Sequence, residues 1–221
     1  MSFNWDDDDR PRWTQETVSE RTHKYQKKLT SGRWVDDYTV ECGRHRDGTK
    51  AFRQWRSASM DDLLIAERNG EKVDKENFRI MSIGDDRTQL WLYRAQEIEE
   101  DDKARTVWLC EGEKDAERLF KEGLLATTCP GGARKWSDSY SEQLKDRKVV
   151  LLPDNDESGR QHMAQAAASL HGIAAEVRVI ELWEAWPEMP ASGDVSDWLE
   201  RGDGTRAELE TLAEKAGVPD W

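Results

Sequence analysis

An apolar run passes abruptly into an acidic one at TVWLCEGEKDA, residues 106–116. Its first five residues form the kind of compact apolar run found in buried strands of parallel sheets. Glu111 and Gly112 follow, and the sequence then predicts a helix from Glu113 to about Glu122, which Gly123 ends. A buried strand that leads directly into a helix indicates the start of an α/β unit.

The same alternation continues downstream. Three further strands are predicted at residues 125–129, 148–152 and 175–180, and helices lie between them at about 139–144 and 158–170. Strands and helices that alternate at this spacing form right-handed βαβ units and a parallel sheet. We therefore expect a Rossmann-like α/β domain over residues 105–201, with about four parallel strands and flanking helices. A C-terminal helical tail is expected at 202–221.

The residues upstream differ in character. Residues 1–33 are highly charged and poor in aliphatic side chains, so we expect a charged, flexible or partly helical arm. Residues 34–104 contain short aromatic and β-branched runs separated by turn residues, which indicate a small mixed lobe rich in antiparallel strands. Within this lobe, residues 78–83 and 89–93 are expected to pair as a hairpin.

Composition excludes several classes of protein. Hydrophobic and charged residues each make up 36% of the 221 residues, and the mean hydropathy is -0.93. No apolar run is long enough to cross a bilayer, and the N-terminus lacks the apolar centre of a signal peptide, so we expect a soluble, cytoplasmic protein with no membrane partner. The net charge of -13 argues against a protein held on nucleic acid by bulk electrostatics, but it allows a local basic face.

The cysteines do not indicate a disulfide framework or a zinc site. The chain contains three of them, Cys42, Cys110 and Cys129. Cys42 and His45 have a ligand-like spacing, but no second Cys/His pair completes a tetrahedral site. We predict no zinc.

Acidic residues follow three of the four predicted strands. Glu111 follows the first strand, Asp154 and Asp156 follow the third, and Asp194 and Asp197 lie in the loop after the fourth. Open parallel sheets build their sites at the carboxyl ends of strands, so these side chains are expected to converge. Carboxylates so close would repel one another unless a cation neutralised them, and Mg²⁺ (or Mn²⁺) suits this donor set.

Two of these segments resemble the motifs of the Toprim family. Residues 111–116 look like its glutamate motif, EG-x-x-D, and residues 154–159 match its second motif, D-x-D-x-x-G. Residues 193–199 are similar to a segment of phage and plasmid DNA primases and primase-helicases, and residues 130–136 resemble their glycine-rich loop. The resemblance covers about residues 106–201. A response-regulator-like receiver domain also gathers acids at strand ends, but it places its acidic pair and its lysine differently.

The resemblance implies a role for each acidic residue. Glu111 would be the general acid and base, or a metal ligand, in phosphoryl transfer. Asp154 and Asp156 would hold Mg²⁺, and Asp194 would help as a third acidic site.

It also implies supporting roles that each have a plainer alternative. Gly112 and Gly159 would let the backbone approach the site closely. Asp115 would orient the site or only cap its helix, and Asp197 would support the site or serve as an N-terminal helix carboxylate.

Four basic residues are candidates for contact with nucleic acid or nucleotide. Arg134 and Lys135 would meet phosphates, or they are ordinary solvated charges. Arg53 and Arg56 alternate with aromatic residues in a way that suits single strands, which bind by stacking and phosphate pairing. The tryptophans of this lobe suit the packing of a small core equally well.

Three functions remain open. The first is a primase-type nucleotidyltransferase of a phage or mobile element, a DNA primase or its catalytic part, that uses a single-stranded DNA template and nucleotides. A helicase or a zinc-ribbon protein would then be its partner. The second is a Toprim-type metal-dependent nuclease, and the third is a non-catalytic Toprim-fold accessory protein.

Overall fold

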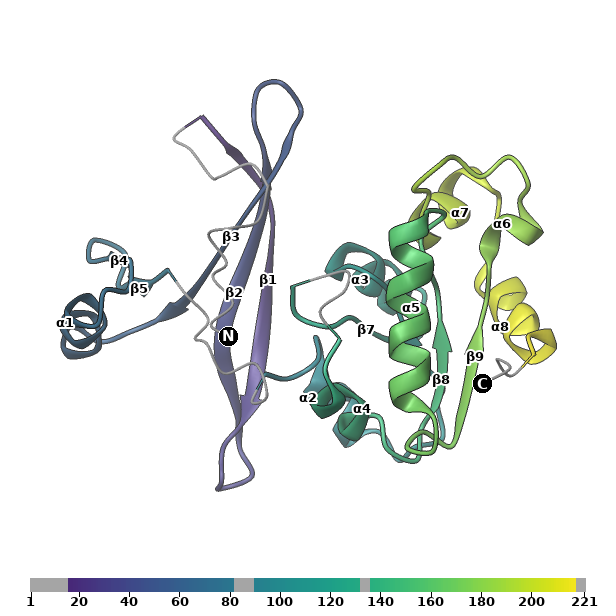
Figure 1. Cartoon of the computed structure of the whole chain (residues 1–221), viewed down its shortest axis with the longest axis horizontal. Coiled ribbons are helices and arrows are strands. Elements are labelled where there is room, and N and C mark those ends of the chain that lie inside the picture. The colour runs from purple at the N-terminus through teal and green to yellow at the C-terminus, as the bar shows by residue number, and fades with distance from the viewer. Residues whose placement is uncertain (1–15, 82–89, 132–135, 218–221) are drawn as a thin grey trace. The chain divides into compact units, whose positions relative to one another are not determined.

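The computed structural model describes residues 16–81, 90–131 and 136–217. The chain divides into two compact units, residues 1–87 and 88–221 (Figure 1). The sequence predicts a boundary at 104/105, whereas Leu92 and Tyr93 already form hydrogen bonds with Gln143 and Thr128 of the second unit. In the described ranges, no helix has the length and apolar character needed to span a membrane.

The first unit is built on an antiparallel sheet. Its elements are β1 (Val18–Lys28), β2 (Trp34–Arg44), β3 (Lys50–Ser57), α1 (Met60–Arg68), β4 (Val73–Asp74) and β5 (Arg79–Ile80). The five strands lie in the order β1-β2-β3-β5-β4, and every neighbouring pair is antiparallel. Ser59 begins α1 with a capping box that includes Asp62. Leu63 and Ala66 of this helix pack on Ile80 and form a small core.

The first strand corrects the arm that the sequence predicts over residues 1–33. Residues 18–28 form β1, which pairs with β2 along its length. Only every second side chain of a strand needs to be buried. His23 and Tyr25 supply that alternation, and the Tyr25 ring stacks on Tyr38 with 4.5 Å between the ring centroids. Residues 1–15 of the predicted arm lie outside the described residues.

The hairpin expected between residues 78–83 and 89–93 is also corrected. Residues 79–80 form β5, but they pair with β3 and β4. Residues 90–93 form no strand, and their backbone bonds belong to the second unit: Leu92 N–H donates to Gln143 Oε1 at 2.8 Å and Tyr93 N–H to Thr128 O at 3.0 Å. The predicted turn between the two runs lies outside the described residues.

The second unit is an α/β domain. Its elements are α2 (Ala95–Glu100), β6 (Val107–Leu109), α3 (Glu113–Lys121), β7 (Leu125–Thr127), α4 (Asp138–Gln143), β8 (Lys148–Leu151), α5 (Glu157–Leu170), β9 (Glu176–Val179), α6 (Leu182–Ala185), α7 (Val195–Arg201) and α8 (Arg206–Lys215). The strands lie in the order β7-β6-β8-β9 and all pairs are parallel. The predicted α/β class is confirmed: a sheet of four parallel strands with flanking helices, preceded by an antiparallel-rich lobe.

The strand order decides where the acidic residues meet. β6 and β8 are neighbours at the centre of the sheet, and all their residues except Lys148 are buried. α3 packs against β7 and β6 and also contacts α7, while α5 packs against β9 and α4 (Figure 1). The carboxyl ends of β6 and β8 therefore open side by side, next to the first turns of α3 and α5.

Candidate active site

Glu111 and Asp154 form a hydrogen-bonded pair at the ends of the two central strands. Leu109 of β6 lies beside Leu151 of β8, and each chain then runs on to its acidic residue. Asp154 N–H donates to Glu111 Oε1 at 2.9 Å. Parallel pairing of adjacent strands thus brings together two carboxylates that are 43 residues apart.

Burial and mutual repulsion change the acidity of both groups. Burial raises the pKa of Asp154 to about 9, and the charges of Glu111, Asp115, Asp194 and Asp156 add to the shift. Burial also raises the pKa of Glu111, together with the charges of Asp156 and Asp194, although the hydrogen bond from Asp154 N–H opposes it. A positive charge beside the two carboxylates would favour their ionised forms.

Gly159 allows this pair to form. It lies in the first turn of α5, and a Cβ atom at this position would overlap Glu111 Oε1. The same atom would lie 2.7 Å from the carbonyl oxygen of Asp154 and 2.9 Å from its nitrogen. At Gly112, by contrast, a Cβ atom would meet nothing closer than Asp115 Oδ2 at 3.9 Å. Of the two glycines singled out from the sequence, Gly159 is the one that the packing requires.

Asp115 lies against the same cluster from α3. Its side chain is buried and accepts a hydrogen bond from Ser196 Oγ of α7. Burial raises the pKa of Asp115 to about 6, and the charge of Asp194 contributes. Gly112, not Asp115, is the N-cap residue of α3, and it makes no side-chain cap. Asp115 therefore joins α3 to α7 and does not cap its helix.

Asp194 and Asp197 form the N-terminal cap of α7. Asp197 N–H donates to Asp194 Oδ1 at 2.9 Å, and Asp194 N–H points back to Asp197 Oδ2 at 3.4 Å. Asp197 also lies 3.4 Å from Arg201. For Asp197, the structure shows the arrangement of an N-terminal helix carboxylate.

Asp156 also caps a helix. Its Oδ1 accepts from Gly159 N–H at 2.8 Å, and its Oδ2 accepts from Ser192 Oγ at 2.7 Å. These bonds lower the pKa of Asp156, the bond from Gly159 N–H most strongly. Asp156 lies near enough to raise the pKa of Glu111 and Asp154 by its charge, while its Oδ1 is engaged in the cap and its Oδ2 in the bond from Ser192.

Lys114 is a part of the site that the sequence reasoning missed. Its Nζ contacts Asp194 Oδ2 and lies 3.6 Å from Asp115 Oδ1. Burial lowers the pKa of Lys114, but the charges of Asp115 and Asp194 outweigh burial, so the pKa lies above its ordinary value. A signal was available, since Lys114 occupies a variable position inside the predicted EG-x-x-D motif.

The donor set fits a hard divalent cation by its chemistry. Burial raises the pKa of the Cys110 thiol, and the charges of four surrounding acids add to it: Asp115, Asp154, Asp194 and Glu111. Carboxylate oxygens of this kind are the ligands that Mg²⁺ and Mn²⁺ prefer. Among the described residues, however, no three His, Cys, Asp or Glu side chains are already arranged around one metal position. The Lys114 ammonium supplies a positive charge to the cluster.

Two of the four basic candidates have carboxylate partners. Arg53 pairs with Glu41 at 2.6 Å, and Arg56 pairs with Glu71 at 2.8 Å, both within the first unit. Trp55 between them is 6% exposed, so it packs the core of that unit. Arg134 and Lys135 lie outside the described residues.

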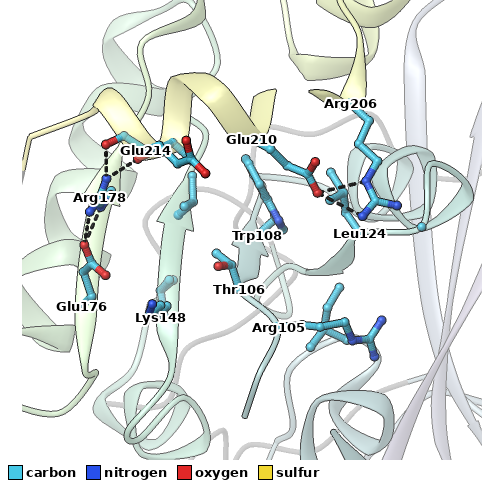
Figure 2. A pocket seen from close by; sticks show the side chains of 15 residues that line it. Arg105, Thr106, Trp108, Leu124, Lys148, Glu176, Arg178, Arg206, Glu210 and Glu214 are labelled. Carbon is cyan, nitrogen blue, oxygen red and sulfur yellow. Dashed lines mark hydrogen bonds and ion pairs between the residues drawn. The ribbon is translucent and has the colours of Figure 1, made fainter. Parts of the chain in front are cut away.

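A separate cavity lies at the other end of the parallel sheet. It measures about 390 Å³ and is lined by the starts of the strands and by α8 (Figure 2). In its walls, Arg178 pairs with Glu176 of the same strand, β9, and Arg206 pairs with Glu210 of the same helix, α8. None of the clustered acids lines it. The acidic cluster, with its perturbed carboxylates, is therefore the better candidate for an active site.

Comparisons with known proteins are limited to solved structures, since no protein-family model matches the sequence and no curated protein matches it. The chain is similar to the Aquifex aeolicus primase (zinc-binding and RNA polymerase domains), with 21% identity, a TM-score of 0.49, and coverage of 88% of this chain and 45% of that one. It is similar to a DnaG primase catalytic domain bound to ssDNA, with 19% identity, a TM-score of 0.47, and coverage of 88% and 58%. The chain is also similar to a DNA primase domain from Pseudomonas aeruginosa, with 18% identity, a TM-score of 0.48, and coverage of 88% of this chain and 57% of that one. The chain spans about half the length of these structures.

Proposed function

We propose that this chain is a Mg²⁺-dependent nucleotidyltransferase of the primase type, a DNA primase or the catalytic part of one, from a phage or mobile element. The observation that carries the proposal is the hydrogen-bonded pair of Glu111 and Asp154 at the ends of adjacent parallel strands. The order of the EG-x-x-D and D-x-D-x-x-G motifs along the chain, which resembles the Toprim family, supports it.

In this proposal, the acidic residues have different roles in phosphoryl transfer. Asp154 and Glu111 would hold Mg²⁺ or Mn²⁺, with Asp194 as a further ligand. When bound, the ion would stabilise the negative charge that develops on the transferred phosphoryl group. As the alternative to binding the ion, Glu111 would take up or release a proton at a carboxylate oxygen, since burial raises its pKa. Asp115 would keep α3 and α7 in register through its bond to Ser196.

Two other features contribute in this proposal. Asp156 would hold the start of α5 against the site by its bond to Gly159 N–H, and its negative charge would add to the attraction for the metal. Arg134 and Lys135 would meet the phosphates of the incoming nucleotide.

The first unit would contact single-stranded DNA. Arg53 and Arg56 alternate with aromatic residues on β3, and both would exchange their carboxylate partners for phosphates when the template binds. Since the net charge is -13, this contact is expected to be local and sensitive to salt. A helicase or a zinc-ribbon protein would be the partner of such an enzyme, and it would work in the cytoplasm.

An extension assay tests the proposal. Purified protein is incubated with single-stranded DNA, labelled nucleotides, and Mg²⁺ or Mn²⁺. We expect labelled products with the wild-type protein and none with Glu111→Gln or Asp154→Asn. Glu142→Gln is the matched control, because it removes one exposed acid on α4 and should leave extension unchanged.

The same assay separates the alternatives. Shortened DNA without extension, lost in the Glu111 and Asp154 variants, would assign the site to a metal-dependent nuclease. DNA binding with neither reaction would assign the chain to accessory proteins, and the catalytic proposal would be wrong.

A further inference from the structure

Lys114 lies inside the acidic cluster, on the first turn of α3. Its Nζ contacts Asp194 Oδ2, and Asp115 Oδ1 lies 3.6 Å away. The other oxygen of Asp194 is already committed, since it accepts the bond from Asp197 N–H that caps α7. The ammonium group of Lys114 therefore occupies Oδ2, the carboxylate oxygen of Asp194 that does not cap α7.

We propose that Lys114 is a built-in counter-ion that occupies the Asp194 carboxylate in place of a divalent cation, and that a metal ion must displace its ammonium group from Asp194 in order to bind there. This inference rests on the proposed function, because it concerns the metal site assigned there. It adds a residue that sets the affinity for metal and maintains the site when metal is absent.

The surroundings of Lys114 fit this role. Asp115 is 6% exposed, and in addition to burial the charges of Glu111, Asp115 and Asp194 all raise the pKa of Asp154. Carboxylates packed so closely need a positive charge nearby, because their repulsion is strong where water is excluded. Among the described residues, Lys114 is the lysine or arginine that pairs with Asp194 and Asp115. Its contacts also join α3 to α7, so it stabilises the cluster as a unit.

The side chain is also able to leave. Its exposed fraction is 41%, which places part of the flexible stem in solvent, and four rotatable bonds can carry the ammonium group outward. An ammonium group and Mg²⁺ both bind carboxylate oxygens, and their positive charges repel each other. Each therefore weakens the binding of the other to Asp194 Oδ2. The absence of a preformed three-carboxylate site among the described residues agrees with a cluster arranged around a lysine.

Mn²⁺ binding measured by electron paramagnetic resonance tests the inference directly, without any need for activity. Lys114→Met is expected to bind Mn²⁺ about tenfold more tightly than wild type, since a competing charge has been removed. Lys114→Gln keeps a hydrogen-bond donor but no charge and should also bind more tightly, so it serves if the Met variant folds poorly. Lys114→Arg keeps the charge and should stay near wild type. Lys121→Met is the matched control, since it removes an exposed lysine from the last turn of the same helix.

Thermal unfolding supplies a second measurement. In EDTA, Lys114→Met should unfold at a lower temperature than wild type and Lys121→Met. Added Mn²⁺ should raise its unfolding temperature by more than it raises that of wild type, because the metal replaces the lost counter-ion.

The outcomes separate this inference from the proposed function. Equal Mn²⁺ affinity in wild type, Lys114→Met and Lys114→Gln would overturn the role of Lys114 and leave the metal site standing. Weaker binding in the neutral variants would make Lys114 a support of the site, which also contradicts the inference. Failure of wild type and every variant to bind Mn²⁺ would overturn both the inference and the metal-dependent function. Tighter binding in the neutral variants, combined with no nucleotide transfer by wild type, would sustain the inference and refute only the polymerase.

Discussion

Replacing Gly159 by alanine tests the packing that brings the two central carboxylates together. In a helix interior, alanine is more favourable than glycine by about 1 kcal/mol, so propensity alone predicts a stabilised protein. The added Cβ would overlap Glu111 Oε1 and would lie within 2.9 Å of both the nitrogen and the carbonyl oxygen of Asp154. The Glu111 side chain can rotate away, but the Asp154 backbone continues from the buried strand β8 and cannot shift freely. Overpacking of this kind costs about 1–3 kcal/mol, which should exceed the gain in propensity.

A cost of about 1–3 kcal/mol against a gain of about 1 kcal/mol leaves a net loss centred on about 1 kcal/mol, so we expect Gly159→Ala to lower the free energy of unfolding by about that amount. Nucleotide transfer should fall by about 100-fold or more, because Glu111 is forced from its position beside Asp154. Hydrogen–deuterium exchange in urea, measured on peptides from α5, reports the stability of this unit separately from the first. Gly112→Ala is the matched control for stability, since its Cβ would meet nothing closer than 3.9 Å. If Gly159→Ala is as stable as wild type or more stable, the close approach is not a constraint and the reasoning is refuted.

Two further predictions concern buried ionisable side chains of the second unit. Burial lowers the pKa of His162 to about 4, so the unfolded chain binds an extra proton between about pH 6.5 and pH 4. Stability should fall by up to about 3 kcal/mol as the pH is lowered through that window, and His162→Gln should unfold with a flatter pH profile in urea titrations. Arg147 and Arg105 both pair with Asp101, at 2.6 Å and 2.7 Å, but Arg147 is buried and Arg105 is 53% exposed. Arg147→Met should cost about 3–5 kcal/mol in chemical denaturation and Arg105→Met at most about 1 kcal/mol, and equal losses would contradict the burial argument.

The α/β part of the fold could be predicted from the sequence because its signals are local. The run 148–152 is apolar and bounded by turn residues, and the structure places β8 at Lys148–Leu151. The predicted helix at 158–170 likewise corresponds to α5 at Glu157–Leu170. Buried parallel strands need side chains that are apolar on both faces, and that requirement is visible in a single chain.

The antiparallel unit was harder to predict because its strands are polar on one face. β1 carries mostly polar and charged residues, and only His23 and Tyr25 are buried in it. Its pairing with β2 depends on residues far along the chain, which no local pattern reveals. For the same reason, residues 90–93 resemble a strand in sequence, while their backbone bonds go to Gln143 and Thr128.

The candidate site was predictable in its location and less so in its details. Glu111 and Asp154 each follow a predicted strand, and the parallel pairing of these two strands makes the two residues neighbours. Residue type alone does not distinguish a metal ligand from a helix cap, and the oxygens of both Asp156 and Asp194 take part in helix caps. Lys114 was missed because a lysine on a charged helix usually faces solvent.

The central claim is that Glu111, Asp154 and Asp194 form one divalent-metal site. Its most direct test is an anomalous-difference map from crystals of the full chain grown with Mn²⁺. The account predicts the strongest manganese peak about 2.1 Å from a carboxylate oxygen of Asp154 and within reach of Glu111 or Asp194, with the Lys114 ammonium group moved away from Asp194. A strongest peak elsewhere, or an acidic cluster that keeps Lys114 and holds no manganese at saturating concentration, would contradict it.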